Sequence, residues 1–108
     1  MNDIRRLEDM QGAVKAIEAY APATYEAFLS DDRVQDAIMF NLVIMGEAAN
    51  HISDEFQAQH PSIPWAALIG TRNVIVHGYD QVKLPIVWDI IQTDLLSLKL
   101  EINSLLDL

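Results

Sequence analysis

The sequence predicts an all-α protein, an antiparallel bundle of four to five helices, and three observations support this fold class. Apolar residues recur every three to four positions over several long segments, which is the period of an amphipathic helix. Prolines and cap-type residues separate these segments, and no convincing pair of strands is present. With 108 residues, 51% of them hydrophobic, the chain is long enough for one core and short for two. We therefore expect a single helical domain over residues 1–108.

The first helix is predicted to begin at Asn2 or Asp3, which are both cap-type residues, and to end near Tyr20. Pro22 follows, and residues 24–29 are expected to form one or two further turns. The first helix has an apolar stripe at spacings of three and four residues: Ile4, Leu7, Met10, Val14 and Ile17.

The polar cluster Ser30-Asp31-Asp32 predicts the start of a long helix, because cap-type and acidic side chains are favourable in a first turn. Phe40, Val43 and Ile44 form a second apolar stripe beside the main one. A helix that is apolar around most of its circumference must be covered on more than one side. This helix is therefore either the central helix of the bundle or part of a subunit interface. Its main apolar face carries Val34, Ala37, Ile38, Asn41, Leu42, Met45, Ala49 and Ile52.

Two more helices are expected in the second half of the chain. One runs from Pro64 to His77; its β-branched residues 74–76 would by themselves also allow a strand, but no partner strand exists. Gly78 is expected to end this helix in a left-handed conformation, with a loop over residues 79–84. Pro85 opens the last helix, whose apolar residues keep helical spacing to the end of the chain: Val87, Ile90, Ile91, Leu95, Leu98, Ile102 and Leu105.

Composition excludes several classes of protein. Seven basic against sixteen acidic side chains give a net charge of −9, the reverse of a polyanion-binding surface, so any contact with nucleic acid has to be local. The absence of cysteine excludes a disulfide framework and a cysteine nucleophile. The N-terminal stretch lacks the apolar core of a secretion signal, and no apolar run approaches the roughly 18 residues of a membrane span. We expect a soluble cytoplasmic protein without membrane association.

Familiar catalytic motifs are absent. The sequence has no glycine-rich phosphate loop, no nucleophile elbow and no HExxH zinc helix. His51 and His60 share no helical face with a carboxylate at metal-ligand spacing, so we expect surface positions for both. Neither a metal nor a cofactor is expected.

The segment from Arg72 to Tyr79 is the strongest functional candidate, since it places a cation, an amide, an imidazole and a phenol within eight residues. Asn73 and His77 are four residues apart and share one face of a helix. Arg72 lies about 140° from His77 around the helix, and we expect both at the mouth of one cleft. Gly78 should allow Tyr79 to fold back towards them. A phosphate group would find a fork-shaped donor and a proton carrier there.

The pattern Arg-x4-His-x-Tyr, formed by Arg72, His77 and Tyr79, resembles the signature of the HEPN superfamily, in particular the HepT-like toxins. The likeness extends over nearly the whole chain, through Met45-Gly46-Glu47-Ala48-Ala49-Asn50, Ile63-Pro64-Trp65 and Val87-Trp88-Asp89 in the same order. It implies a homodimeric HEPN-like domain that cleaves RNA without a metal. In that family Arg72 would hold the scissile phosphate and His77 would transfer protons, as its two catalytic residues.

The resemblance also implies a toxin–antitoxin pair. HepT-like toxins are paired with a minimal nucleotidyltransferase antitoxin of the MntA type, which transfers AMP to the motif tyrosine, here Tyr79. An adenylyl group there would add bulk and negative charge beside Arg72 and His77, where an RNA phosphate has to bind.

Structural explanations exist for each of these residues. Arg72 would also serve as an ion-pair partner for Glu47, a carboxylate in an apolar run, and such a pair would fix the guanidinium, with Asn73 as a second supporting residue. His77 would also stabilise the end of a helix, and Tyr79 would also cover the end of the bundle. Two other functions therefore stay open: a non-catalytic module that binds a nucleotide or docks a nucleotidyltransferase, and a purely structural helical dimer.

Overall fold

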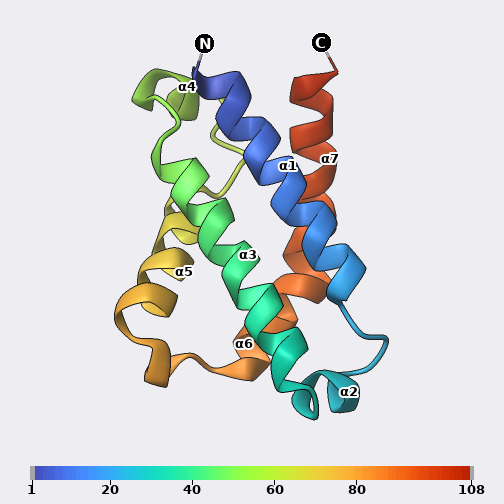
Figure 1. Cartoon of the computed structure of the whole chain (residues 1–108). Helices are drawn as coiled ribbons and strands as arrows, with labels where there is room; N and C mark the ends of the chain where they lie inside the picture. Colours follow the sequence, from blue (N-terminus) through green and yellow to red (C-terminus); the bar gives the residue numbers. More distant parts are fainter. Residues whose placement is uncertain (1, 108) are drawn as a thin grey trace.

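The structure, a computed structural model, describes residues 2–107, which form a helical bundle without strands (Figure 1). The all-α bundle predicted from the sequence is confirmed. Two short helices, α2 (Tyr25–Leu29) and α4 (Asp54–Gln59), and the 3-10 turn η1 (Tyr79–Gln81) lie between the longer ones. The longer helices are α1 (Asn2–Tyr20), α3 (Asp32–Asn50), α5 (Trp65–His77) and a C-terminal helix made of α6 (Leu84–Asp89), the π-helical turn η2 (Ile90–Asp94) and α7 (Leu95–Leu106).

Helix α3 is the central helix, since it packs against α1 on one side and α5 on the other (Figure 1). It begins as predicted: the Asp31 carboxylate accepts hydrogen bonds from the backbone N–H groups of Arg33 and Val34, both at 3.1 Å. Most of its apolar residues are buried, but Phe40 is 64% exposed. One side of the central helix is therefore left uncovered by this chain.

Helix α1 lies against α3 and α7, and the two described ends of the chain reach the same end of the bundle (Figure 1). A hydrogen bond of 2.8 Å from the Gln11 amide to Asn103 joins α1 to α7. The core between the long helices contains Leu7, Met10, Val14, Ile17, Ile38, Met45, Leu98 and Ile102. No helix within residues 2–107 combines the length and apolar character needed to cross a membrane.

Helix α4 was not predicted. The Ser53 hydroxyl caps it by accepting from the Phe56 N–H at 3.2 Å, and Asp3 holds the cap in place. The buried Asp3 carboxylate accepts from the Ser53 N–H at 2.9 Å and from its hydroxyl at 2.7 Å. A six-residue helix of this kind depends on a tertiary contact with α1 more than on its own pattern.

Gly78 does not adopt the left-handed conformation that we expected, since its φ is −134° and its ψ is 46°. Its N–H donates to the Val74 carbonyl at 2.8 Å, and its own carbonyl accepts from the Gln81 N–H at 2.7 Å. Helix α5 therefore passes directly into the 3-10 turn η1. That turn satisfies the end of the helix without a left-handed residue.

Candidate active site

Gly46 lets α3 and α5 approach each other closely at the centre of the candidate site. A Cβ atom at this position would overlap the Cβ of Arg72 and lie 2.6 Å from the carbonyl oxygen of Leu68. Only a residue without a side chain fits between the two helices here. The close approach places Arg72 beside Glu47, the residue that follows Gly46.

The guanidinium of Arg72 is held from two sides. Its Nη2 lies 2.9 Å from Oε2 of Glu47, which is the ion pair expected from the sequence, and its Nη1 donates to Oδ1 of Asn73 at 2.8 Å. The Arg72 side chain keeps 26% of its surface exposed and that of Glu47 keeps 41%. The Nε–H is buried without a partner in the described part of the chain. A guanidinium has five N–H donors, so one N–H on each of the two Nη atoms stays available to an anion.

His51 joins this cluster from the end of α3. Its Nδ1 lies 2.8 Å from the Glu47 carbonyl oxygen, to which it must donate, and 3.7 Å from Oε1 of Glu47. We predicted only a surface position for His51, and its side chain is 45% exposed. Our expectation that His51 shares no helical face with a carboxylate was wrong, because Glu47 lies four residues before it, and this spacing was the signal that could have revealed the contact.

His77 and Asn73 lie on the exposed side of α5. No hydrogen bond or ion pair of His77 is present among residues 2–107, so its imidazole is open to solvent. Arg72 and His77 are not in direct contact, since five residues of helix turn them about 140° apart. Both side chains nevertheless reach the surface within one and a half turns of the same helix.

Tyr79 differs from our expectation. Its hydroxyl donates to Oδ1 of Asp36 on α3, at 3.4 Å, and not to a group of the Arg72–His77 segment. The 3-10 turn η1, which replaces the left-handed exit at Gly78, places the Tyr79 hydroxyl within hydrogen-bond distance of α3. Tyr79 is 62% exposed, so its hydroxyl remains accessible.

Apolar residues that are exposed or, at Val43, half-buried lie beside this cluster. Asp36, Phe40, Val43 and Glu47 follow each other at spacings of four, three and four, so they share one stripe of α3. The ends of this stripe contact Tyr79 and Arg72, so Phe40 and Val43 lie on α3 between these two contacts, and residues 73–78 span the same interval on the side of α5. That part exposes Val76 by 46%. The apolar band, as we call it, consists of Phe40, Val43, Val76 and Tyr79.

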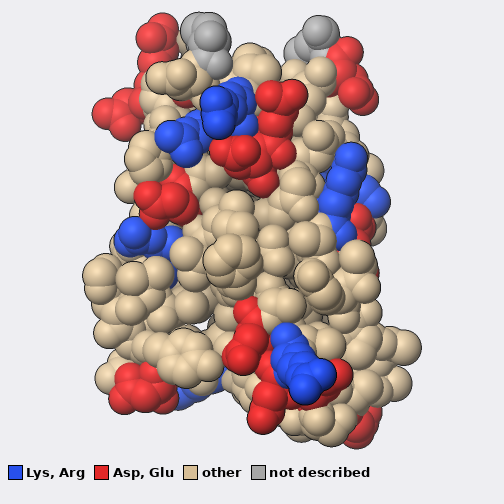
Figure 2. All heavy atoms as spheres, viewed as in Figure 1, with Lys and Arg blue, Asp and Glu red and all other residues tan. Residues whose placement is uncertain are grey.

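Figure 2 shows a matching distribution of charge on the face that α3 crosses. Acidic and basic side chains gather towards the two ends and the edges of this face, and the surface over the middle of α3 is uncharged. Exposed apolar side chains, such as those of the apolar band, are typical of a protein–protein contact.

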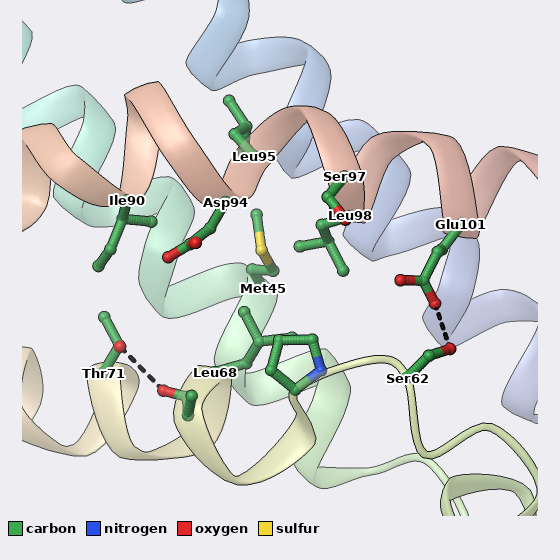
Figure 3. Close-up of a pocket in the computed structure, with 12 residues that line it drawn as sticks. Met45, Ser62, Leu68, Thr71, Ile90, Asp94, Leu95, Ser97, Leu98 and Glu101 are labelled. Carbon is green, nitrogen blue, oxygen red and sulfur yellow. Dashed lines mark hydrogen bonds between the residues drawn. The ribbon is translucent and has the colours of Figure 1, made fainter.

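A groove between α5 and the C-terminal helix is one of the concave features near α5 (Figure 3). It encloses about 260 Å³ and is mainly apolar, with Met45 and Leu68 from α3 and α5 facing Ile90, Leu95 and Leu98. A hydrogen bond of 2.6 Å between Ser62 and Glu101 closes one end. The groove is lined by Asp94 and Glu101 and by no cation, so it offers nothing to bind an RNA phosphate.

Comparison with known proteins decides the family. The model of a family described as "Ribonuclease HepT-like" matches residues 10–105. The chain belongs to the HepT-like ribonuclease family. The HepT-like match includes every residue of the candidate cleavage site, from Gly46 to His77, and it agrees with the all-α fold of the chain.

Three relatives of this HepT-like chain have ribonuclease names. A protein of Thermococcus cleftensis named "Probable ribonuclease HepT" is 35% identical over 94 residues, which cover 86% of each chain. A candidate ribonuclease of Methanocaldococcus jannaschii is 28% identical over 87% of this chain and 86% of its own. One of Caldanaerobacter subterraneus is 29% identical over 83% and 80%. No solved structure matches the chain significantly.

Proposed function

We propose that this chain is a single HEPN-like domain acting as the toxin of a toxin–antitoxin pair, a metal-independent endoribonuclease whose site is completed by a second copy. The observation that carries the proposal is the Arg72 guanidinium, which is paired with Glu47 at 2.9 Å and lies five residues before the exposed imidazole of His77. The family to which the chain belongs is one of ribonucleases. A cation and a proton carrier at one surface suit the cleavage of a phosphodiester.

The chemistry needs no group beyond these side chains and the RNA. The ribose 2′-oxygen forms a bond to the adjacent phosphorus while the bond from phosphorus to the 5′-oxygen breaks. One imidazole accepts the proton of the 2′-hydroxyl and another donates a proton to the departing oxygen. Arg72 binds the phosphate and stabilises its added negative charge, and Glu47 and Asn73 keep the guanidinium in position.

A second copy supplies what one chain lacks. General acid and general base act together, whereas each chain brings one imidazole, His77, to the motif, and His51 is bonded to Glu47. The apolar band beside the motif suits a two-fold contact, since the same surface on two copies would cover Phe40 and Val76 and bring both motifs together.

The proposed partner is a nucleotidyltransferase antitoxin of the MntA type that transfers AMP to Tyr79. Tyr79 is 62% exposed and lies two residues from His77, so it is within reach of another protein. The added phosphate and adenosine would occupy the surface on which RNA binds.

The test is RNA cleavage by the purified, unmodified chain with EDTA present. We expect fragments ending in a 2′,3′-cyclic phosphate, and a loss of rate of about 100-fold or more in Arg72→Ala and in His77→Ala. Circular dichroism of both variants controls for folding. Fragments with 3′-hydroxyl ends that form only with added divalent metal would contradict the proposal.

The second candidate function is a non-catalytic module that docks a nucleotidyltransferase. The net charge of −9 favours it, because an acidic chain repels RNA at long range. The growth rate of cells that produce the chain without its partner distinguishes the endoribonuclease from the docking module. An enzyme stops growth unless Arg72 or His77 is replaced, and a docking module leaves growth unchanged.

A further inference from the structure

In the contact between Tyr79 and Asp36 the phenol is the hydrogen-bond donor and the carboxylate is the acceptor. The Tyr79 hydroxyl donates to Oδ1 of Asp36 across 43 residues of sequence, at 3.4 Å, and joins η1 to the first half of α3. A carboxylate can only accept, so the phenolic proton points at Asp36. The phenolic oxygen keeps its lone pairs directed away from that bond.

Both partners are open to a second protein. Asp36 is exposed and Tyr79 is 62% exposed, so the contact lies on the surface of the bundle. Within residues 2–107 the Asp36 carboxylate has no other hydrogen bond or ion pair, so no basic group competes for it.

We propose that Asp36 is the general base for nucleotide transfer to Tyr79, an inference that rests on the proposed modification of that residue. The phenolic oxygen attacks the α-phosphorus of a nucleoside triphosphate bound to the transferase. The bond from that phosphorus to the bridging oxygen breaks, and pyrophosphate leaves. The phenolic proton passes to the Asp36 carboxylate, so the toxin itself supplies the base for its own inactivation.

The geometry distinguishes Asp36 from its neighbour Asp80. Asp80 follows Tyr79 directly in the chain and is also exposed, but it makes no hydrogen bond with the phenol. Both carboxylates place the same charge near Tyr79, the residue that accepts AMP, but only Asp36 accepts the hydrogen bond of its hydroxyl. Asp80→Asn is therefore a matched control for the loss of one negative charge.

The experiment measures AMP incorporation by intact mass after mixing the purified chain with ATP and a nucleotidyltransferase of the MntA type. We expect Asp36→Asn to lower the rate about 100-fold, Asp36→Glu to recover it to within about tenfold of wild type, and Asp80→Asn to leave it unchanged. RNA cleavage by unmodified Asp36→Asn should equal that of wild type, because Asp36 takes no part in cleavage.

The outcomes separate two kinds of failure. Modification of Asp36→Asn at the wild-type rate overturns the role of Asp36 and leaves Tyr79 as the acceptor. An equal fall of cleavage and modification in Asp36→Asn also overturns it, since that result shows a structural effect. No AMP on the wild type, or undiminished AMP on Tyr79→Phe, overturns the proposed regulation itself.

Discussion

At the residue scale, Arg72 owes its position to two partners on different elements. Glu47 holds it from α3 at 2.9 Å, and Asn73 holds it from its own helix at 2.8 Å. A guanidinium held in this way loses less entropy when it binds a phosphate, which is the physical value of a supporting ion pair. Glu47 is thus a positioning residue in this account.

Replacement of Glu47 by alanine should lower kcat for RNA cleavage about tenfold while KM changes little, because the guanidinium then samples other rotamers. The unfolding free energy should fall by about 1 kcal/mol or less, since the pair is partly exposed. Steady-state kinetics and urea unfolding measure the two effects.

The matched control is Glu18→Ala. Glu18 forms an ion pair of similar exposure with Lys99, at 3.1 Å on α1 and α7. Its loss should cost similar stability and no activity. Equal kinetic losses in the two variants would refute the positioning role of Glu47.

The sequence predicted part of this site for a clear reason. A carboxylate in an apolar run needs a cation, and Arg72 was the obvious partner for Glu47. The bond between Asp36 and Tyr79 was beyond prediction, because it depends on how η1 leaves α5 and on the register of α5 against α3.

At the element scale, Gly46 sets the distance between α3 and α5. Gly46→Ala should lower the unfolding free energy by roughly 1–3 kcal/mol, because the new methyl group meets Arg72 and the backbone of Leu68. Cleavage should fall as well, since α5 carries the motif. Thermal unfolding and cleavage rates measure both effects.

Gly12→Ala is the control for this prediction. Gly12 lies inside α1, and a Cβ there meets nothing within 4 Å. The same substitution should therefore stabilise the protein by up to about 1 kcal/mol through helix propensity. A stabilised Gly46→Ala would show that the two helices are farther apart than described.

The helices show where the local sequence pattern is sufficient to predict the bounds of an element. Long periodic segments with strong caps, such as α3 after Asp31, were predicted close to their observed bounds. The sequence did not predict the six-residue α4 or the π-helical turn within the last helix. Helix α4 depends on its contact with Asp3 of α1, which local pattern does not show. The π-helical turn differs from an α-helix only in its backbone hydrogen bonds, which the spacing of apolar residues does not reveal.

At the scale of the whole molecule, the bundle buries its core yet leaves the apolar band uncovered. Phe40 is 64% exposed at the middle of the central helix, where the surface of Figure 2 carries no charge. The sequence predicted that α3 is central or part of an interface. The structure confirms the first and leaves the second as a prediction.

The central claim is that a second copy completes the cleavage site across the apolar band. Sedimentation velocity combined with RNA cleavage tests it in Phe40→Ser, with Leu100→Ser as control, since Leu100 is 60% exposed on α7. The account predicts twice the 12.1 kDa chain mass for wild type and Leu100→Ser, and a folded monomer about 100-fold less active for Phe40→Ser. A monomeric Phe40→Ser that cleaves RNA at the wild-type rate would contradict it.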